Sequence, residues 1–303
     1  MQASVIEIDV LCVGHAAFDI TMAVDHHPGR NEKCAASAMA ACGGGPAANA
    51  AVTVARLGGT SGFAGYLGRD TYGCLHCEEL AGEGVHTRWI ARGDHPTPLS
   101  VILVKPDGDR TVVNHRAGTP FLNAGEIDFS SCRPKVILFD GHEPLISLPL
   151  AKTARAAGIP TVLDAGSVHK GTVDLLPLVS HVVSSARFAR DFTGEADPHR
   201  ALEKLSLSAP FTAVTLGEKG LIWKETTGGG GVLPSYRVDA ADTTGAGDAF
   251  HGAFALGVAR SDDLETTLRH ASATAAITCT RLGARIAIPT GREVEDFLGV
   301  HGY

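Results

Sequence analysis

Runs of apolar, β-branched residues alternate with helical patterns along most of the chain. Strand-length apolar runs predict buried strands at residues 6–13, 61–66, 87–91, 136–139, 161–163, 181–183 and 213–216. Apolar residues spaced by three and four predict helices over residues 46–57, 70–83, 249–258 and 263–281. Pro46 suits the first turn of its helix, and Gly58 suits a helix end. This alternation is typical of a doubly wound, mainly parallel α/β sheet flanked by helices.

Residues 98–115 depart from this strand–helix alternation. Two apolar runs flank Pro106-Asp-Gly-Asp109, a turn sequence that favours a β-hairpin. Residues 21–42 contain Pro28, Gly29 and several small polar residues, which favour short strands and loops. We expect both segments to form a small β-sheet lid over a cleft. The predicted division is a core of residues 1–14, 43–95 and 121–303 and a lid of residues 15–42 and 96–120.

Two glycine-rich turns lead directly into predicted helices. One is Asp242-Thr-Thr-Gly-Ala-Gly-Asp248, which follows an expected strand end at residues 236–238, and the other is Gly43-Gly-Gly-Pro46. A helix N-terminus presents unpaired backbone N–H groups and the positive end of the helix dipole, so an anion is the expected ligand. Asp248 fits there either as a capping acid or as a base for a hydroxyl that attacks a phosphoryl group.

Polar residues follow several of the predicted strands. Asp19 lies beyond the first strand, and Asp140, His142 and Glu143 follow the strand at residues 136–139. Open α/β sheets bind ligands outside the carboxyl ends of their parallel strands. The alternative is that these are ordinary loop residues, and their positions alone do not distinguish the two interpretations.

Composition restricts the class of ligand. The chain has 303 residues, 44% of them hydrophobic and 19% charged, and a net charge of −7, which argues against nucleic-acid and anionic-membrane partners. It has neither an apolar run of membrane-spanning length nor a basic-then-apolar leader, and its seven cysteines are scattered. We therefore expect a cytoplasmic protein with reduced thiols. Cys74-Leu-His-Cys77 lacks the second ligand pair of a zinc site.

The chain resembles the ribokinase-like, or PfkB, family of carbohydrate kinases. Residues 43–58 resemble the N-terminal signature of the family, and residues 242–250 resemble its C-terminal signature. Residues 215–220 and 280–284 extend the resemblance across the chain. The resemblance implies a doubly wound domain with a β-sheet lid, and transfer of the γ-phosphoryl group of ATP, with Mg²⁺, to a sugar hydroxyl.

The resemblance also implies roles for individual positions. Asp248 matches the catalytic base, and the anion hole would comprise Gly245, Ala246 and Gly247. The positions that match sugar contacts are Asp19, Gly44, Gly45, Asn49 and Glu143. The positions that match the nucleotide site are Ser185, Thr215, Gly217, Gly220 and Cys279. Backbone carbonyls of Asp242 and Thr244 match a site for a monovalent cation such as K⁺.

This sequence departs from the family pattern near the metal ions. Ser185 and Phe188 stand where the family often has the Asn and Glu of an Asn-x-x-Glu motif that organises magnesium and phosphates. Magnesium is then expected to be held through phosphates, water and other carboxylates. Ala287 stands where ribokinases have a serine at the cation site, so dependence on K⁺ is left open.

The identity of the sugar rests on four side chains. Lys33, Asn114 and the ending Cys-Thr-Arg-x-Gly-x-Arg resemble bacterial sulfofructose kinases, in which the first two positions can face a sulfonate. His142 replaces an expected arginine, and a neutral imidazole suits an anion less well than a guanidinium does. Glu143 would repel a sulfonate. We therefore expect a neutral ketohexose or pentose.

Three alternatives remain beside a kinase of neutral sugars. They are a sulfofructose kinase, a nucleoside kinase and a non-catalytic sugar-binding regulator. Few aromatic residues are available to stack a nucleobase, since they make up only 6% of the chain. We also expect a homodimer formed through the lid, because a small sheet cannot bury both of its faces alone.

Overall fold

The computed structural model describes residues 5–116 and 118–301, and in these residues nine strands form the larger of two sheets. Its strands are β1 (Ile6–Val13), β4 (Ser61–Gly68), β5 (Ile90–Gly93), β8 (Cys132–Phe139), β9 (Thr161–Ala165), β10 (His181–Ser185), β11 (Phe211–Thr215), β12 (Leu221–Glu225) and β13 (Gly230–Leu233). Their order across the sheet is β13-β12-β11-β10-β9-β8-β1-β4-β5. All pairs are parallel except those of β12 and β13, which close one edge as an antiparallel hairpin.

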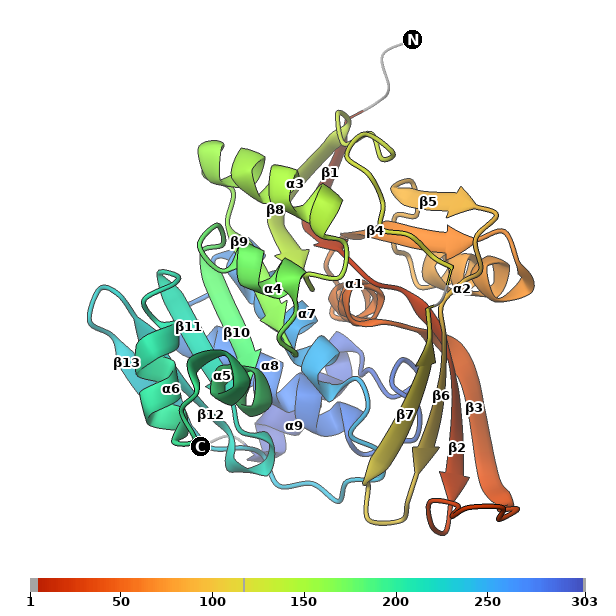
Figure 1. Cartoon of the computed structure of the whole chain (residues 1–303). Coiled ribbons are helices and arrows are strands. Elements are labelled where there is room, and N and C mark those ends of the chain that lie inside the picture. The colour runs from red at the N-terminus through yellow and green to blue at the C-terminus, as the bar shows by residue number, and fades with distance from the viewer. Residues whose placement is uncertain (1–4, 117, 302–303) are drawn as a thin grey trace.

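Helices cover both faces of this sheet, because its central strands are apolar on both sides. In β1, Val10 and Cys12 belong to one hydrophobic cluster, whereas Leu11 and Val13 belong to another. The first cluster includes residues of α1 (Pro46–Arg56), α2 (Thr71–Gly82), α7 (Ala246–Arg260) and α8 (Leu264–Thr278). The second includes residues of α3 (Pro144–Ala156), α4 (Lys170–Leu175), α5 (Ala186–Thr193) and α6 (Pro198–Leu205), which lie in front of the sheet in Figure 1. The predicted doubly wound, mainly parallel fold is confirmed.

A separate sheet of four strands lies to one side of the core (Figure 1). Its order is β3-β2-β6-β7, formed by β2 (Ala17–Val24), β3 (Ala36–Gly44), β6 (Leu99–Val104) and β7 (Arg110–His115). The register aligns Asp19 of β2 with Cys42 of β3 and Ser100 of β6, and aligns Ser100 with Asn114 of β7. Residues that pair directly share one face of a sheet, so Asp19 and Asn114 face the same side. The expected small sheet is thus present.

Two local predictions were wrong. Residues 236–238 form no strand, because Tyr236 is buried edge-on against Phe297 of α9 (Gly291–His301) instead of pairing with the sheet. Gly43 and Gly44 are the last residues of β3 rather than part of a turn, and the chain turns only at Gly45, where φ is 95°. Within residues 5–116 and 118–301 we find no helix with the length and apolarity that crossing a bilayer requires.

Candidate functional site

The turn before α7 is built to leave space at a helix N-terminus. Gly245 is the N-cap, with φ of 79°, and a side chain there would lie 2.7 Å from Cβ of Ala284. By contrast, a Cβ added at Gly247 would have no atom within 4 Å. Asp242 fixes the turn, because its carboxylate accepts from the N–H of Thr244 and from the N–H of Gly283, each at 2.9 Å. The N–H of Ala246 donates to the carbonyl of Thr243 at 3.4 Å, and the first turn of α7 borders open space at the Cβ position of Gly247.

Asp248, in the first turn of α7, meets the N-terminus of α1. The Nδ2 group of Asn49 donates a hydrogen bond of 2.7 Å to Oδ2 of Asp248. Asn49 is buried in the first turn of α1, so the helices that follow the two glycine segments converge here. Burial raises the pKa of Asp248, while the bond from Asn49 and the charge of His251 oppose that rise.

Asp19 and the end of β3 form the floor beside Asp248. A Cβ at Gly44 would lie 2.0 Å from Oδ2 of Asp19, and a Cβ at Gly45 would lie 2.6 Å from the carbonyl oxygen of His15. Burial raises the pKa of Asp19 to about 6, against the hydrogen bond from Ser100. The structure therefore brings together four of the predicted sugar and catalytic positions, namely Asp19, Gly44, Asn49 and Asp248.

Asp140, at the end of β8, ties three segments of the site together. Its carboxylate accepts from the backbone N–H of His15 at 2.7 Å, of Ala47 at 3.2 Å and of His142 at 2.8 Å. Burial alone would raise the pKa of Asp140, but the charge of His142 and these donors lower it to about 2. The ring of His142 lies 4.6 Å from that of His169, between centroids. Asp140 therefore stays ionised and holds these three segments together through its carboxylate.

Glu143 is buried and has partners for both of its oxygens. Oε1 accepts from Nη2 of Arg116 at 2.6 Å, and Oε2 accepts from the N–H of Leu122 at 2.8 Å. Burial raises the pKa of Glu143 to about 7. The expectation that Glu143 repels a sulfonate therefore has no support here, since Arg116 compensates its charge. No local pattern pointed to Arg116, which lies 27 residues from its partner.

The predicted nucleotide positions lie at the carboxyl ends of β10 and β11. Ser185 and Thr215 are direct partners in the register of these strands. The next turn needs glycine at Gly220, where φ is 87° and a Cβ would lie 2.0 Å from the carbonyl oxygen of Leu233. Gly217 in the same turn has φ of 62°. Cys279 caps α8, and its carbonyl oxygen accepts from the N–H of Ala241 at 2.8 Å.

The position of Phe188 explains the missing Asn-x-x-Glu motif. Ser185 is the N-cap of α5: its hydroxyl accepts from the N–H of Phe188 at 3.0 Å and donates to the carbonyl of Gly166 at 2.9 Å. Phe188 is fully buried in the core and stacks on Phe192. Its position therefore contributes packing of α5 and no group that binds an ion.

Asp164 is a site residue to which the sequence assigned no role. It lies in β9, one residue before the carboxyl end, is 7% exposed, and its Oδ2 lies 3.5 Å from Nδ1 of His251 in α7. The two ring nitrogens of His251 also approach the carbonyls of Gly247 and Val183. Burial raises the pKa of Asp164 to about 6, against the charge of His251. An acid near the carboxyl end of a predicted parallel strand is the signal that could have identified it.

Of the two residues linked to an anionic sugar, Lys33 is distant from this floor and Asn114 is not. Lys33 is exposed in the loop beyond the Val24–Ala36 pair, whereas Asp19 pairs with Cys42 toward the opposite end of the same strands. Five residues of strand separate the two ends by about 17 Å. Asn114 is exposed on β7, two strands from Asp19. The structure thus brings Asn114, but not Lys33, toward the floor.

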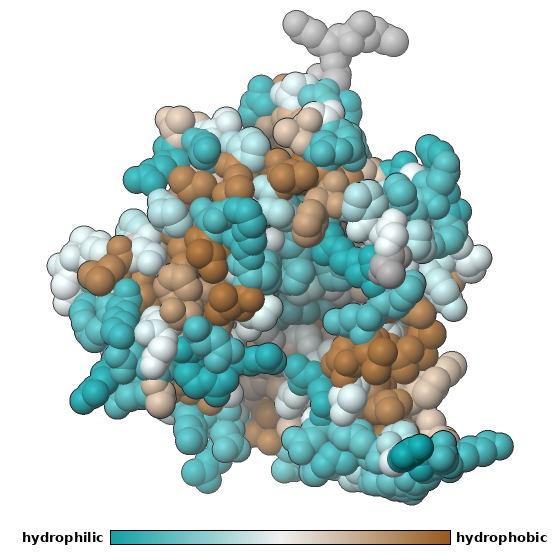
Figure 2. Space-filling model, in the orientation of Figure 1, coloured by the Kyte–Doolittle hydropathy of each residue, from teal (hydrophilic) through white to brown (hydrophobic). Residues whose placement is uncertain are grey.

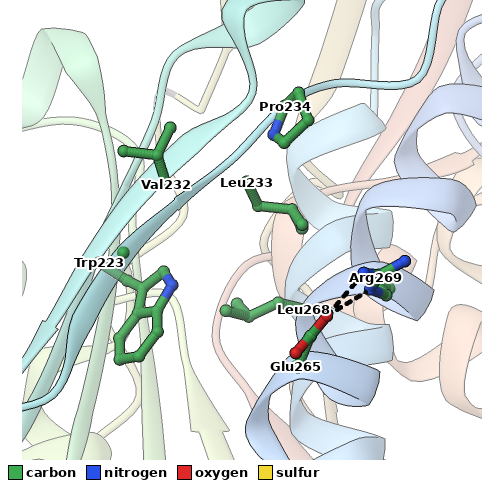
Figure 3. Close-up of a pocket in the computed structure, with 8 residues that line it drawn as sticks. Trp223, Val232, Leu233, Pro234, Glu265, Leu268 and Arg269 are labelled. Carbon is green, nitrogen blue, oxygen red and sulfur yellow. Dashed lines mark hydrogen bonds and ion pairs between the residues drawn. The ribbon is translucent and has the colours of Figure 1, made fainter. Parts of the chain in front are cut away.

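A cavity of about 370 Å³ lies elsewhere, between the β12–β13 hairpin and α8 (Figure 3). Its lining includes Trp223, Leu233 and Leu268, and an ion pair of 2.6 Å joins Glu265 and Arg269 at its edge. It adjoins the first turns of α8, whereas Cys279 caps the other end of that helix. None of the predicted site residues lines it, so its size does not make it the catalytic cleft.

Comparison with known proteins gives consistent matches. Residues 7–291 match the sequence model of the pfkB family carbohydrate kinases. Over 300 residues the chain is 27% identical to a protein named Ribokinase from Bacillus subtilis, covering 96% of this chain and 99% of that one. It is 31% identical over 297 residues to a protein named ATP-dependent ribose-1-phosphate kinase from Halopiger xanaduensis, covering 96% and 98%. A solved structure of Arabidopsis thaliana ribokinase complexed with ribose and ATP superposes with a TM-score of 0.84, at 25% identity and 97% and 99% coverage.

Proposed function

The chain belongs to the pfkB family of carbohydrate kinases, and we propose that it transfers the γ-phosphoryl group of ATP to a hydroxyl of a neutral ketohexose or pentose. The family and the carbohydrate kinase activity that the sequence predicted are confirmed at that level. The observation that most strongly supports phosphoryl transfer to a hydroxyl group is the contact between Asn49 and Asp248 at the N-terminus of α7.

In the proposed mechanism, Asp248 removes the proton of the attacking sugar hydroxyl. Asn49 holds Oδ2 of Asp248, and Oδ1 is the oxygen that takes the proton. The raised pKa of Asp248 makes it a stronger base than an exposed aspartate. The N–H groups at residues 245–247 stabilise the charge that develops on the transferring phosphoryl group. The floor formed by Asp19, Gly44 and Asn49 orients the sugar.

ATP would lie along the ends of β10 and β11, against Ser185, Thr215, Gly217, Gly220 and Cys279. Mg²⁺ neutralises phosphate charge when it is bound. Mg²⁺ commonly keeps several waters and is bound through one or two carboxylates together with substrate phosphates. We propose that Asp164 faces this ion. The carbonyls of Asp242 and Thr244 remain the candidates for K⁺.

The role of Asp164 predicts a change in metal dependence. Asp164→Asn removes one charge facing the ion, so the Mg²⁺ concentration for half-maximal turnover should rise several-fold, with the sugar KM little changed. An unchanged Mg²⁺ dependence would remove Asp164 from the proposal.

The small sheet is the proposed contact of a homodimer. Figure 2 shows apolar residues gathered over this sheet, and Met39 and Val113 on one face of it are 66% and 62% exposed. Light scattering at micromolar concentration should give twice the 31.4 kDa mass of the chain. A single species at 31.4 kDa would contradict the dimer.

The substrate is tested by ADP release with a panel of acceptors. Ribose and fructose should give the highest kcat/KM among ribose, fructose, ribose 1-phosphate, sulfofructose and nucleosides. The phosphorylated pentose belongs in the panel because a 31% identical relative is named for it. Preference for either anionic sugar would overturn the neutral-sugar proposal, and preference for nucleosides would indicate a nucleoside kinase. Sugar binding without ATP binding in calorimetry would indicate a non-catalytic regulator.

A further inference from the structure

Arg285 is buried beneath the sugar floor. Its side chain is 0% exposed, although it belongs to the loop that follows α8. Burying a guanidinium costs several kcal/mol unless the protein supplies partners. Its Nε group donates to Oδ1 of Asn49 at 3.2 Å, across 236 positions of sequence. The chain thus places a charged donor against the residue that holds Asp248.

The surroundings of Arg285 are fitted to its guanidinium group. Nη1 lies 3.9 Å from Oε2 of Glu79, which itself accepts from the N–H of Gly43 at 2.6 Å. A Cβ at Gly43 would lie 2.4 Å from Nη1, so only glycine leaves room for this arginine. Within residues 5–116 and 118–301, neither Nη1 nor Nη2 has a hydrogen-bond partner. The bond from Nε to Asn49 is therefore the directional contact of the side chain.

The amide group of Asn49 can adopt two orientations, and the hydrogen bond from Arg285 selects one of them. The side chain of Asn49 carries an acceptor oxygen and a donor NH₂ group, and rotation by half a turn exchanges their positions. Asp248 accepts a hydrogen bond only from the NH₂ group, because the amide oxygen would repel its carboxylate. The N–H of an arginine can only donate, so it selects the orientation with Oδ1 toward Arg285 and Nδ2 toward Asp248.

We propose that Arg285 is a positioning residue that fixes the amide of Asn49 and thereby holds Asp248 in the orientation of a base. This inference rests on the proposed role of Asp248. Arg285 itself touches neither the reacting oxygen nor the phosphoryl group.

Two substitutions of Arg285 separate its hydrogen bond from its charge. The Nε2 of a glutamine falls near the position of the arginine Nε, so Arg285→Gln retains a donor without the charge. Arg285→Met retains the length of the apolar stem and has no donor. A hydrogen bond to an orienting group corresponds to about 10-fold to 100-fold in rate. We expect kcat to fall by that factor in Arg285→Met and by about threefold or less in Arg285→Gln, with the KM for ATP within about twofold.

Arg56 provides a matched control for damage to the loop. Its Nη1 donates to the carbonyls of Arg285 and Ile288 at 3.0 and 2.7 Å, and it pairs with Glu83. Arg56→Met therefore loosens the same loop from its backbone side without removing the donor to Asn49. It should lower the melting temperature while leaving kcat within about twofold.

A double-mutant cycle keeps the inference testable if Arg285→Met is poorly stable. In an Asn49→Ala background the linking amide is absent, so Arg285→Gln and Arg285→Met should each change kcat by less than about twofold. Multiplicative effects in that background would overturn the inference, as would equal kcat losses in Arg56→Met and Arg285→Met. Asp248→Asn in the same assay reports separately on the proposed function. Full turnover by that variant would reject the base itself, whatever Arg285 does.

Discussion

Gly43 and Gly44, which precede α1, and Gly247, in the first turn of α7, are glycine for opposite reasons. At Gly43 and Gly44 the space of a side chain is already filled, by Arg285 and His76 in one case and by Asp19 in the other, with closest distances of 2.4 Å or less. At Gly247 that space is empty to 4 Å. The first segment is a packed floor and the second borders an opening. A glycine motif read from sequence can thus indicate either a crowded backbone or room for a ligand.

Among substitutions in the two glycine segments, the largest expected effect is that of Gly44→Ala. The added Cβ would lie within 2.7 Å of all three carboxyl atoms of the buried Asp19, so this carboxyl group would have to shift. Overpacking of this kind costs about 1–3 kcal/mol. We expect a lower melting temperature and a fall in kcat/KM for the sugar of about 100-fold. A stable variant with normal sugar binding would show that the floor is not rigid.

The matched change in the second segment is Gly247→Ala, which should lower turnover without lowering stability. No atom obstructs the added Cβ, and alanine is favoured over glycine in a helix by up to about 1 kcal/mol. Stability should be maintained or should rise, while turnover falls about tenfold because the methyl group occupies the proposed phosphoryl space. Unchanged turnover in a steady-state assay would indicate that the opening is not used by the ligand.

The smallest effect is a dependence of sugar affinity on pH. Burial raises the pKa of Asp19 to about 6, so its carboxylate is charged above that pH and protonated below it. If the carboxylate accepts hydrogen bonds from the sugar, affinity is complete above about pH 6 and declines as the pH falls. Calorimetric titration with the sugar between pH 5 and pH 8 measures this pH dependence of affinity directly. Because it measures binding and not turnover, the role of Asp248 as a base does not enter the result. In Asp19→Asn the affinity should be weaker throughout, with no transition near pH 6.

The stability of the fold should respond to Asp19 in the reverse direction. A folded-state pKa above the usual value of 3.8 means that burial of the charged carboxylate opposes folding. Its effect on stability is therefore least favourable above about pH 6 and is relieved as the pH falls. Asp19→Asn removes this charge, so its melting temperature relative to the wild type should be higher at pH 8 than at pH 5. The opposite trend would contradict the assigned pKa.

Local patterns were sufficient to predict most of the fold. The apolar runs identified the parallel strands, and the Asp-Gly turn identified the hairpin of the small sheet, because spacing and turn residues are local properties. The strand predicted at residues 236–238 is absent, because Tyr236 is buried by α9 rather than by a neighbouring strand. Burial alone does not specify which element supplies the partner.

Candidate site residues could be predicted where their role depends on local backbone conformation. They could not be predicted where their role depends on a partner that is remote in sequence. The turn at residues 245–247 follows from glycine and helix pattern alone. Arg116 went unnoticed and Arg285 was noted only as the end of a motif, because the partner of each, Glu143 and Asn49 respectively, is remote in sequence. The expectation that Glu143 would repel a sulfonate left out Arg116 for the same reason. The role of an ionisable residue depends on its partners, which the fold determines.

The central claim is that Asp248, held by Asn49 at the opening before α7, is the base of a sugar kinase. The most direct test is turnover and sugar affinity of Asp248→Asn, which retains the acceptor for Asn49 and removes the basic carboxylate. We predict that kcat falls by about 10²–10⁴, the usual contribution of a general base, while the sugar Kd stays within about threefold. A kcat within tenfold of the wild-type value would contradict the claim.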